Sequence, residues 1–153
     1  MVAAFLPPVA TAKWGAPLSH RELQEQARWS RAVGAPTRCV SQATDYAIAS
    51  SIKQEWLGKT NVLVVAGRKH VEVLLSRRTC FLLRADYLPE LARIDAVFTL
   101  AHESVHVDGE WSKRIADCVG ARRFDRVARV AGFRFAKRAV RTFFRDTACY
   151  PGR

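Results

Sequence analysis

The chain has 153 residues, of which 49% are hydrophobic and 25% are charged, and this composition excludes disorder over most of its length. Its longest uncharged run, residues 1–12, is interrupted by Pro7 and Pro8 and is too short for a membrane span, so we expect no transmembrane helix. The net charge is +11, and +9 of it falls in residues 112–153, which contain 12 basic and three acidic side chains; such a field attracts polyanions.

Residues 1–18 are expected to form a loose N-terminal arm, followed by a single domain over residues 19–153. The end of the uncharged run, Ala10–Ala12, loosely resembles a signal-peptidase site, but no basic residue precedes its apolar part. We therefore expect a cytoplasmic protein, with export as the alternative.

The first half of the chain contains two predicted helices and a predicted hairpin. Ser19 and Glu22 form a capping-box pattern that begins a helix, which Gly34 and Pro36 end. Apolar residues at helical spacing predict a second helix, with Gly58 as its C-terminal stop. Two β-branched runs separated by a short turn predict a β-hairpin. The predicted ranges are 20–33 and Ser41 or Thr44 to Leu57 for the helices, and 61–66 and 70–75 for the strands.

The second half is predicted to be mostly helical. Residues 80–87 fit a strand or a helix equally well. From Pro89 to Gly109, apolar residues recur every three or four positions, which predicts a helix with one buried stripe. Two further helices are expected over residues 111–130 and 133–146, with a break near Gly132. Together these elements indicate an α+β fold with a small hairpin or sheet beside a helical majority.

The four cysteines, Cys39, Cys80, Cys118 and Cys149, are far apart in the sequence. They form no C-x-x-C pair, so the spacing of zinc ribbons is absent. Their even number permits two disulfides, but so low a cysteine content equally suits free thiols, and buried free thiols are our expectation.

The helix that begins at Pro89 contains the pattern H-E-x-x-H at His102, Glu103 and His106. Two histidines four positions apart project from one helical face and can bind a single Zn²⁺. Glu103 then borders the metal as the general base for a metal-bound water. The alternative is a pair of exposed surface histidines, which would not explain why they occur in the most apolar helix. The other two histidines, His20 and His70, are expected to be surface or capping residues.

Residues 96–121, AVFTLAHESVHVDGEWSKRIADCVGA, resemble the active-site region of small bacterial zincin-like proteins of minimal gluzincin type. Members of that family have H-E-S-x-H, two residues, a glycine, and a second helix patterned N-E-x-x-A-E/D-C-x-A. The resemblance is close over these 26 residues and extends in outline to 39–150. It implies a zincin-like fold, with a small sheet beside two zinc-binding helices, and a metallopeptidase mechanism that activates water.

The second helix departs from the family pattern at the third zinc ligand. The family's ligating glutamate aligns with Lys113, whose ammonium cannot bind zinc, and Asp117 aligns with an acidic residue that usually orients a ligand histidine. Three outcomes are open: Asp117 completes the site, Glu110 completes it, or the site is degenerate and binds metal weakly or not at all. A structural alternative for Asp117 is an ion pair with Arg114 or Arg122.

The last two predicted helices have one apolar stripe, and basic residues occupy the remaining arc. Arginine-rich arcs suit phosphate contacts because each guanidinium offers two donors. The sequence has no base-reading signature, so any nucleic-acid binding would be independent of sequence. The candidate polyanion-binding residues are Arg122, Arg126, Arg129, Lys137 and Arg141.

These observations lead to two hypotheses. The first is a zinc metallopeptidase acting on a peptide or protein substrate, with His102, His106 and Asp117 as ligands and Glu103 as general base. The second is a catalytically degenerate basic protein that binds nucleic acid, another polyanion or a protein partner. Lys113 favours the second hypothesis, whereas the intact Glu103 favours the first.

Overall fold

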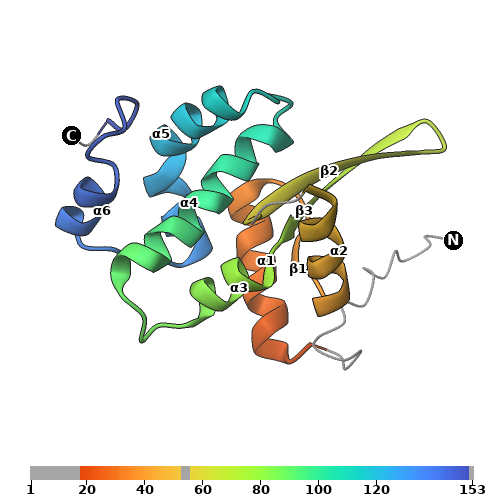
Figure 1. Ribbon diagram of the computed structural model, residues 1–153, viewed down its shortest axis with the longest axis horizontal. Helices are drawn as coiled ribbons and strands as arrows, with labels where there is room; N and C mark the ends of the chain where they lie inside the picture. Colours follow the sequence, from red (N-terminus) through yellow and green to blue (C-terminus); the bar gives the residue numbers. More distant parts are fainter. Residues whose placement is uncertain (1–17, 53–55, 152–153) are drawn as a thin grey trace, which may run out of the picture.

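The computed structural model describes residues 18–52 and 56–151, which form six helices and one three-stranded sheet (Figure 1). The expected α+β class with a helical majority is confirmed. The expected N-terminal arm, except for Leu18, lies outside the described residues. In chain order the elements are α1 (His20–Val33), β1 (Thr37–Cys39), α2 (Gln42–Ile52), β2 (Gly58–Val65), β3 (Arg68–Leu75), α3 (Arg77–Arg84), α4 (Glu90–Val107), α5 (Lys113–Ala131) and α6 (Lys137–Phe143).

Helix α1 has the predicted boundaries because its capping residues act as expected. The Ser19 hydroxyl accepts a hydrogen bond from the Glu22 backbone N–H, and the Glu22 carboxylate accepts one from the Ser19 N–H. Gly34 ends the helix in the left-handed conformation, with φ 89°, which a residue without a Cβ adopts at little cost.

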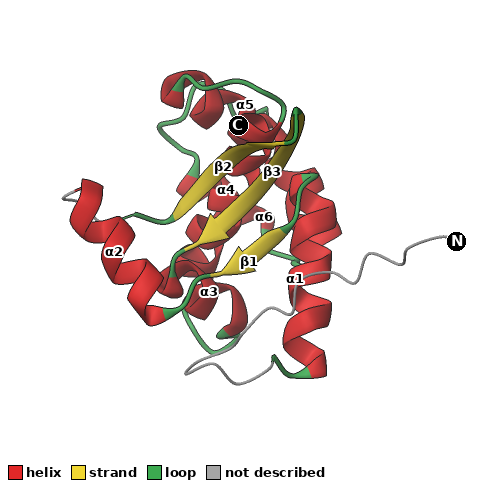
Figure 2. Ribbon diagram, turned by 90° about the vertical axis from the view of Figure 1, so that its right-hand side faces the viewer, coloured by secondary structure: helices red, strands yellow, loops and turns green. Residues whose placement is uncertain are grey.

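The sheet has the strand order β1-β3-β2 (Figure 2). The predicted hairpin is confirmed, since β2 and β3 pair antiparallel from Gly58 opposite Leu75 to Val65 opposite Arg68. Strand β1 was not predicted; it pairs parallel with the end of β3 over three residues. So short a strand has no alternating pattern of its own, and its pairing depends on contacts made elsewhere in the chain.

The second predicted helix lies where it was expected, but its predicted C-terminal end at Leu57 is wrong. Helix α2 is described to Ile52, and Gly58 is the first residue of β2 rather than a helix stop. Trp56, which fitted the helical spacing, is buried in a small cluster with Val40 and Leu74. Its apolar side chain is thus covered by tertiary packing against the sheet.

The ambiguous segment near residues 80–87 forms α3. The Ser76 hydroxyl accepts a hydrogen bond from the Thr79 N–H, and this N-cap begins the helix at Arg77. One short helix therefore follows directly from β3.

Helix α4 lies at the centre of the molecule (Figure 1), in contact with α1, α3, α5, α6, β2 and β3. The predicted apolar stripe is its buried face, and burial of such side chains is the main stabilising contribution in the fold. Its fully buried residues are Ile94, Val97, Leu100 and Ala101. None of the helices in the described part of the chain has the length and apolar character that crossing a membrane requires.

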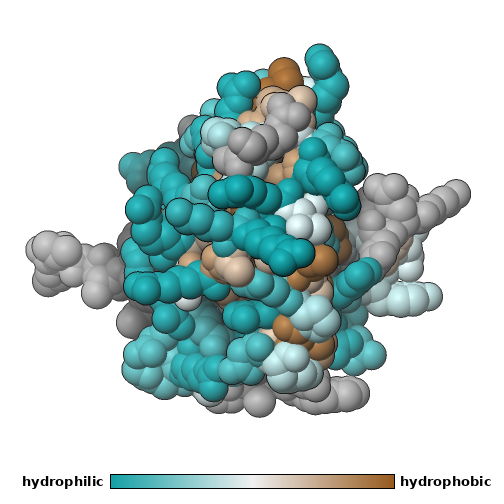
Figure 3. All heavy atoms as spheres, turned by 90° about the vertical axis from the view of Figure 1, so that its left-hand side faces the viewer, coloured by the Kyte–Doolittle hydropathy of each residue, from teal (hydrophilic) through white to brown (hydrophobic). Residues whose placement is uncertain are grey.

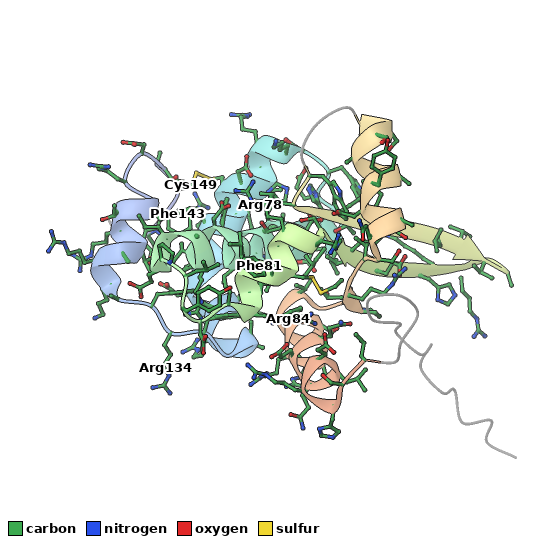
Figure 4. The ribbon with its side chains drawn as sticks, turned by 60° about the horizontal axis from the view of Figure 1, so that its bottom comes forward. Arg78, Phe81, Arg84, Arg134, Phe143 and Cys149 are labelled. Carbon is green, nitrogen blue, oxygen red and sulfur yellow. A yellow bond between two sulfur atoms is a disulfide. The ribbon has the colours of Figure 1, made fainter. Side chains whose placement is uncertain are left out.

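The expectation of free thiols is wrong. Cys39 at the end of β1 is bonded to Cys80 in α3, and Cys118 in α5 is bonded to Cys149 beyond α6 (Figure 4). The partners are 41 and 31 residues apart, so only the packing of the elements brings each pair together. The second disulfide attaches the C-terminal segment to the helix that contains Asp117.

Candidate active site

Helix α4 brings its two motif histidines together, as their spacing predicts. The Nε2 atoms of His102 and His106 lie 2.9 Å apart. Both side chains are half-buried, and their nitrogens converge on one point beside the helix.

Each histidine is oriented through its other ring nitrogen. The Asp117 carboxylate accepts a hydrogen bond from Nδ1 of His102 at 2.7 Å, and the Glu110 backbone carbonyl accepts one from Nδ1 of His106. A carbonyl oxygen can only accept, and so can an ionised carboxylate, so both Nδ1 atoms carry the proton. In neutral rings the two Nε2 atoms are then both acceptors. Two facing acceptors repel unless a cation, either a proton or a metal ion, lies between them.

The spacing of the two Nε2 atoms is close to that of two ligands of one zinc ion, and a catalytic zinc site ordinarily has a third protein ligand. Zinc binds imidazole nitrogen at ~2.0–2.1 Å, so a tetrahedral ion would need the two Nε2 atoms about 3.3 Å apart. The observed 2.9 Å requires a shift of only a few tenths of an ångström. However, no group of three or more His, Cys, Asp or Glu side chains forms a metal-binding cluster within residues 18–52 and 56–151. The two histidines are therefore the candidate protein ligands that the geometry offers directly.

Glu103 is held next to the histidine pair by a contact with the sheet. Its side chain is buried, and one carboxylate oxygen accepts a hydrogen bond of 2.6 Å from the Thr60 hydroxyl in β2. Burial raises the pKa of Glu103, while the Thr60 hydrogen bond and the nearby histidines act in the opposite direction. A carboxyl group with a raised pKa that contacts the same cavity as the histidines is suited to proton transfer.

Two glycines allow the neighbouring elements to approach α4. A Cβ on Gly58 would lie 2.8 Å from the Thr99 side chain and 3.0 Å from Oε1 of Glu103. A Cβ on Gly120 would lie 3.1 Å from the backbone of His102. Strand β2 and helix α5 can therefore pack this closely only because both positions lack side chains. The sequence predicted no role for Gly120 or Thr60; the small residues of the predicted helix after the motif are a signal for Gly120, whereas Thr60 belongs to β2 and has no such signal.

The two histidines and the carboxyl groups of Glu103 and Asp117 line one cavity of about 520 Å³, a volume within the range of small-ligand sites. Trp111 forms part of its wall and stacks on the His106 ring, with 5.7 Å between ring centroids and 10° between planes. Strand β2 and helices α4 and α5 supply most of the lining. The lining residues are Ile48, Trp56, Leu57, Gly58, Lys59, Thr60, Asp95, Phe98, Thr99, His102, Glu103, His106, Trp111, Lys113 and Asp117.

The candidates for a third ligand occupy different positions. Asp117 contacts Nδ1 of His102, the nitrogen across the ring from the convergent pair. The Glu110 side chain accepts a hydrogen bond from the Ser112 N–H, and only its backbone carbonyl contacts a histidine. Lys113 lines the cavity, as the alignment of α5 with the family pattern implies. His20 and His70, which were expected at the surface, are both exposed.

The predicted basic residues do not line this cavity. They are exposed on α5 and α6, and none of them forms an ion pair with another described residue. These residues are Arg122, Arg126, Arg129, Lys137 and Arg141. The opposite face of the same helices is apolar and buried, as their stripe predicts, through Phe124, Val127, Ala128, Ala131 and Val140. Hydrophilic side chains cover most of the molecular face on the α6 side (Figure 3).

Comparison with known proteins gives no further assignment: no family model matches the chain, and neither a curated protein nor a solved structure matches it.

Proposed function

We propose that the protein is a zinc-dependent metallopeptidase with a zincin-like fold. The observation that carries this proposal is the convergence of Nε2 of His102 and Nε2 of His106 at 2.9 Å while both Nδ1 atoms donate elsewhere. Such a pair needs a cation, and two imidazoles on one helical face are a common zinc donor set. The buried Glu103 next to the pair supports hydrolytic chemistry rather than a purely structural metal site.

In this proposal Glu103, Thr60 and Trp111 each have a role in the reaction. A zinc ion held by His102 and His106 would supply a water of lowered pKa and would polarise a substrate carbonyl. The Glu103 carboxylate would accept a proton from the attacking water and would return it to the leaving amine. The Thr60 hydroxyl holds Glu103 in position, and the Trp111 ring keeps the His106 imidazole in its orientation.

For Asp117 the geometry favours an orienting role over ligation. Its carboxylate accepts from Nδ1 of His102, which fixes the ring and makes Nε2 a better donor to a metal. Ligation by Asp117 would require it to leave that nitrogen. We therefore propose that His102 and His106 would hold the zinc ion and that Asp117 would orient His102.

Metal analysis combined with peptide cleavage tests this function. We expect about one zinc per chain in the wild type, loss of zinc in His102→Ala, and retained zinc in the surface control His70→Ala. Glu103→Gln should keep the metal and lower cleavage of a fluorogenic peptide library by 10²–10⁴-fold, because the amide cannot accept the proton. Stoichiometric zinc in His102→Ala, or full cleavage by Glu103→Gln, would contradict the proposal.

A second candidate function rests on the exposed basic face of α5 and α6. Arg123 of α5 is paired with Asp108, but the five candidate residues named above have no carboxylate partners in the described structure, so their charge is available to an external polyanion. We infer sequence-independent binding of nucleic acid or another polyanion, and double-stranded DNA is the probe that tests it. A double variant, Arg126→Ala with Arg129→Ala, should weaken binding similarly for unrelated duplexes and reduce its salt dependence. Unchanged affinity at 50 mM salt would exclude this face as the binding surface.

A further inference from the structure

The Lys113 side chain lies in the wall of the candidate active site and has no ion-pair partner among the residues that the structure describes. Lys113 is the first residue of α5, its side chain is exposed, and it lines the same cavity as both histidines. No hydrogen bond or ion pair of its ammonium group is found with the residues that the structure describes. Lys113 lies one helical turn before Asp117 and therefore on the same face of the helix.

Two of the acidic side chains of the cavity accept hydrogen bonds from other residues of its lining. The Glu103 carboxylate accepts from Thr60, and the Asp117 carboxylate accepts from His102. By contrast, Lys59, the other cation of the lining, is exposed and without an ion pair in the described structure. The lining therefore contains two ammonium groups that form no ion pair in the described structure, beside three carboxyl groups, of which Glu103 and Asp117 accept hydrogen bonds.

Aromatic side chains form much of the remaining wall. Trp111 is about half exposed, at 54%, although one of its faces is stacked on His106. Phe98 and Trp56 line the cavity as well. A wall of this kind accepts an apolar side chain, while a neighbouring ammonium attracts a negative group. The two features together fit a peptide that carries an apolar residue next to a carboxylate.

We propose that Lys113 binds a carboxylate of the peptide substrate and thereby determines specificity. This inference rests on the proposed peptidase function. An ammonium here repels a metal cation but attracts an anionic group that approaches the same site. The carboxylate has two possible sources, the C-terminus of the peptide or the side chain of an internal aspartate or glutamate. The first source would make the enzyme a carboxypeptidase, and the second an endopeptidase with acidic specificity.

Binding measurements on an inactive variant test the proposal independently of cleavage. Glu103→Gln protein is titrated, with and without zinc, with three acetylated probes: Ala-Phe with a free carboxylate, Ala-Phe amide, and Ala-Phe-Glu-Ala amide. We expect about fivefold tighter binding of one acidic probe than of the neutral amide, the strength of a partly exposed ion pair. The acidic probe that is preferred identifies the source of the carboxylate.

Variants at position 113 then assign the preference. In the Glu103→Gln background, Lys113→Ala should abolish the preference for the acidic probe and Lys113→Arg should retain it. Lys137→Ala on α6 should leave this preference unchanged. Equal affinity for acidic and neutral probes, no binding of any probe, or a preference that survives Lys113→Ala would overturn the inference. Failure of the peptidase function is seen separately, as a wild type that binds acidic probes through Lys113 but retains no zinc or cleaves no peptide.

Discussion

The Asp117 carboxylate lies 2.7 Å from Nδ1 of His102, so that a side chain of α5 orients the first histidine of the motif in α4. Gly120 makes this contact possible, because its missing Cβ allows α5 to approach the backbone of His102. The orientation of the candidate zinc donor thus depends on the packing of two helices.

Replacing Asp117 by asparagine should weaken zinc binding without abolishing it. The amide keeps the shape of the side chain but loses the charge that holds the Nδ1–H of His102, and such losses typically reduce metal affinity 10–100-fold. Competition with a chromogenic chelator measures the change. Asp146→Asn, at an exposed position beyond α6, is the matched control and should leave the affinity unaltered. If Asp117 ligates the metal itself, its substitution should instead reduce the zinc stoichiometry as severely as His102→Ala.

Replacing Lys113 by glutamate should tighten zinc binding by about tenfold or more. The change removes a positive charge from the cavity and adds a carboxylate at the position where the resembling family has its ligand. Isothermal titration with zinc compares this variant with Lys137→Glu, which alters the net charge equally but lies on α6. Identical affinities in the two variants would show that Lys113 does not face the metal position.

Replacing Gly120 by alanine should destabilise the protein by roughly 1–3 kcal/mol, because the new methyl group would be forced against the backbone of His102. Helix propensity alone predicts the opposite, a gain of about 1 kcal/mol. Urea unfolding of the oxidised protein distinguishes the two effects by sign. A more stable Gly120→Ala protein would mean that α4 and α5 are not in close contact at this point.

Replacing Glu22 by glutamine should lower the free energy of unfolding by roughly 0.5–1 kcal/mol at neutral pH. Hydrogen bonds from the Ser19 N–H and hydroxyl, together with the charge of Arg84, lower the pKa of Glu22. Because the folded pKa is the lower one, this stabilisation is present above the pKa of the unfolded chain, about 4.3, and disappears as pH falls through the folded value. Unfolding of the wild type and of Glu22→Gln at neutral and at strongly acidic pH measures this contribution. A difference in the free energy of unfolding that increased on acidification would contradict the prediction.

Local features could be predicted because their causes are close together in the sequence. The capping box of Ser19 and Glu22 determines where α1 begins, and the hairpin forms from two adjacent runs. In the same way, the spacing of His102 and His106 places both rings on one face of α4. The helical period is a property of the backbone, so this juxtaposition needs no tertiary contact.

The sequence by itself therefore determined the class of the fold, the central helix and the histidine pair with its neighbouring glutamate. Only the tertiary structure decided what surrounds them: the hydrogen bond from Thr60 to Glu103, the contact of Asp117 with His102, and the two disulfides. It also revealed Gly58 as a point of close packing instead of a helix stop. The physical reason is that these contacts join residues 15–45 positions apart. Such contacts depend on how helices and strands bury their apolar faces together, which no local pattern specifies.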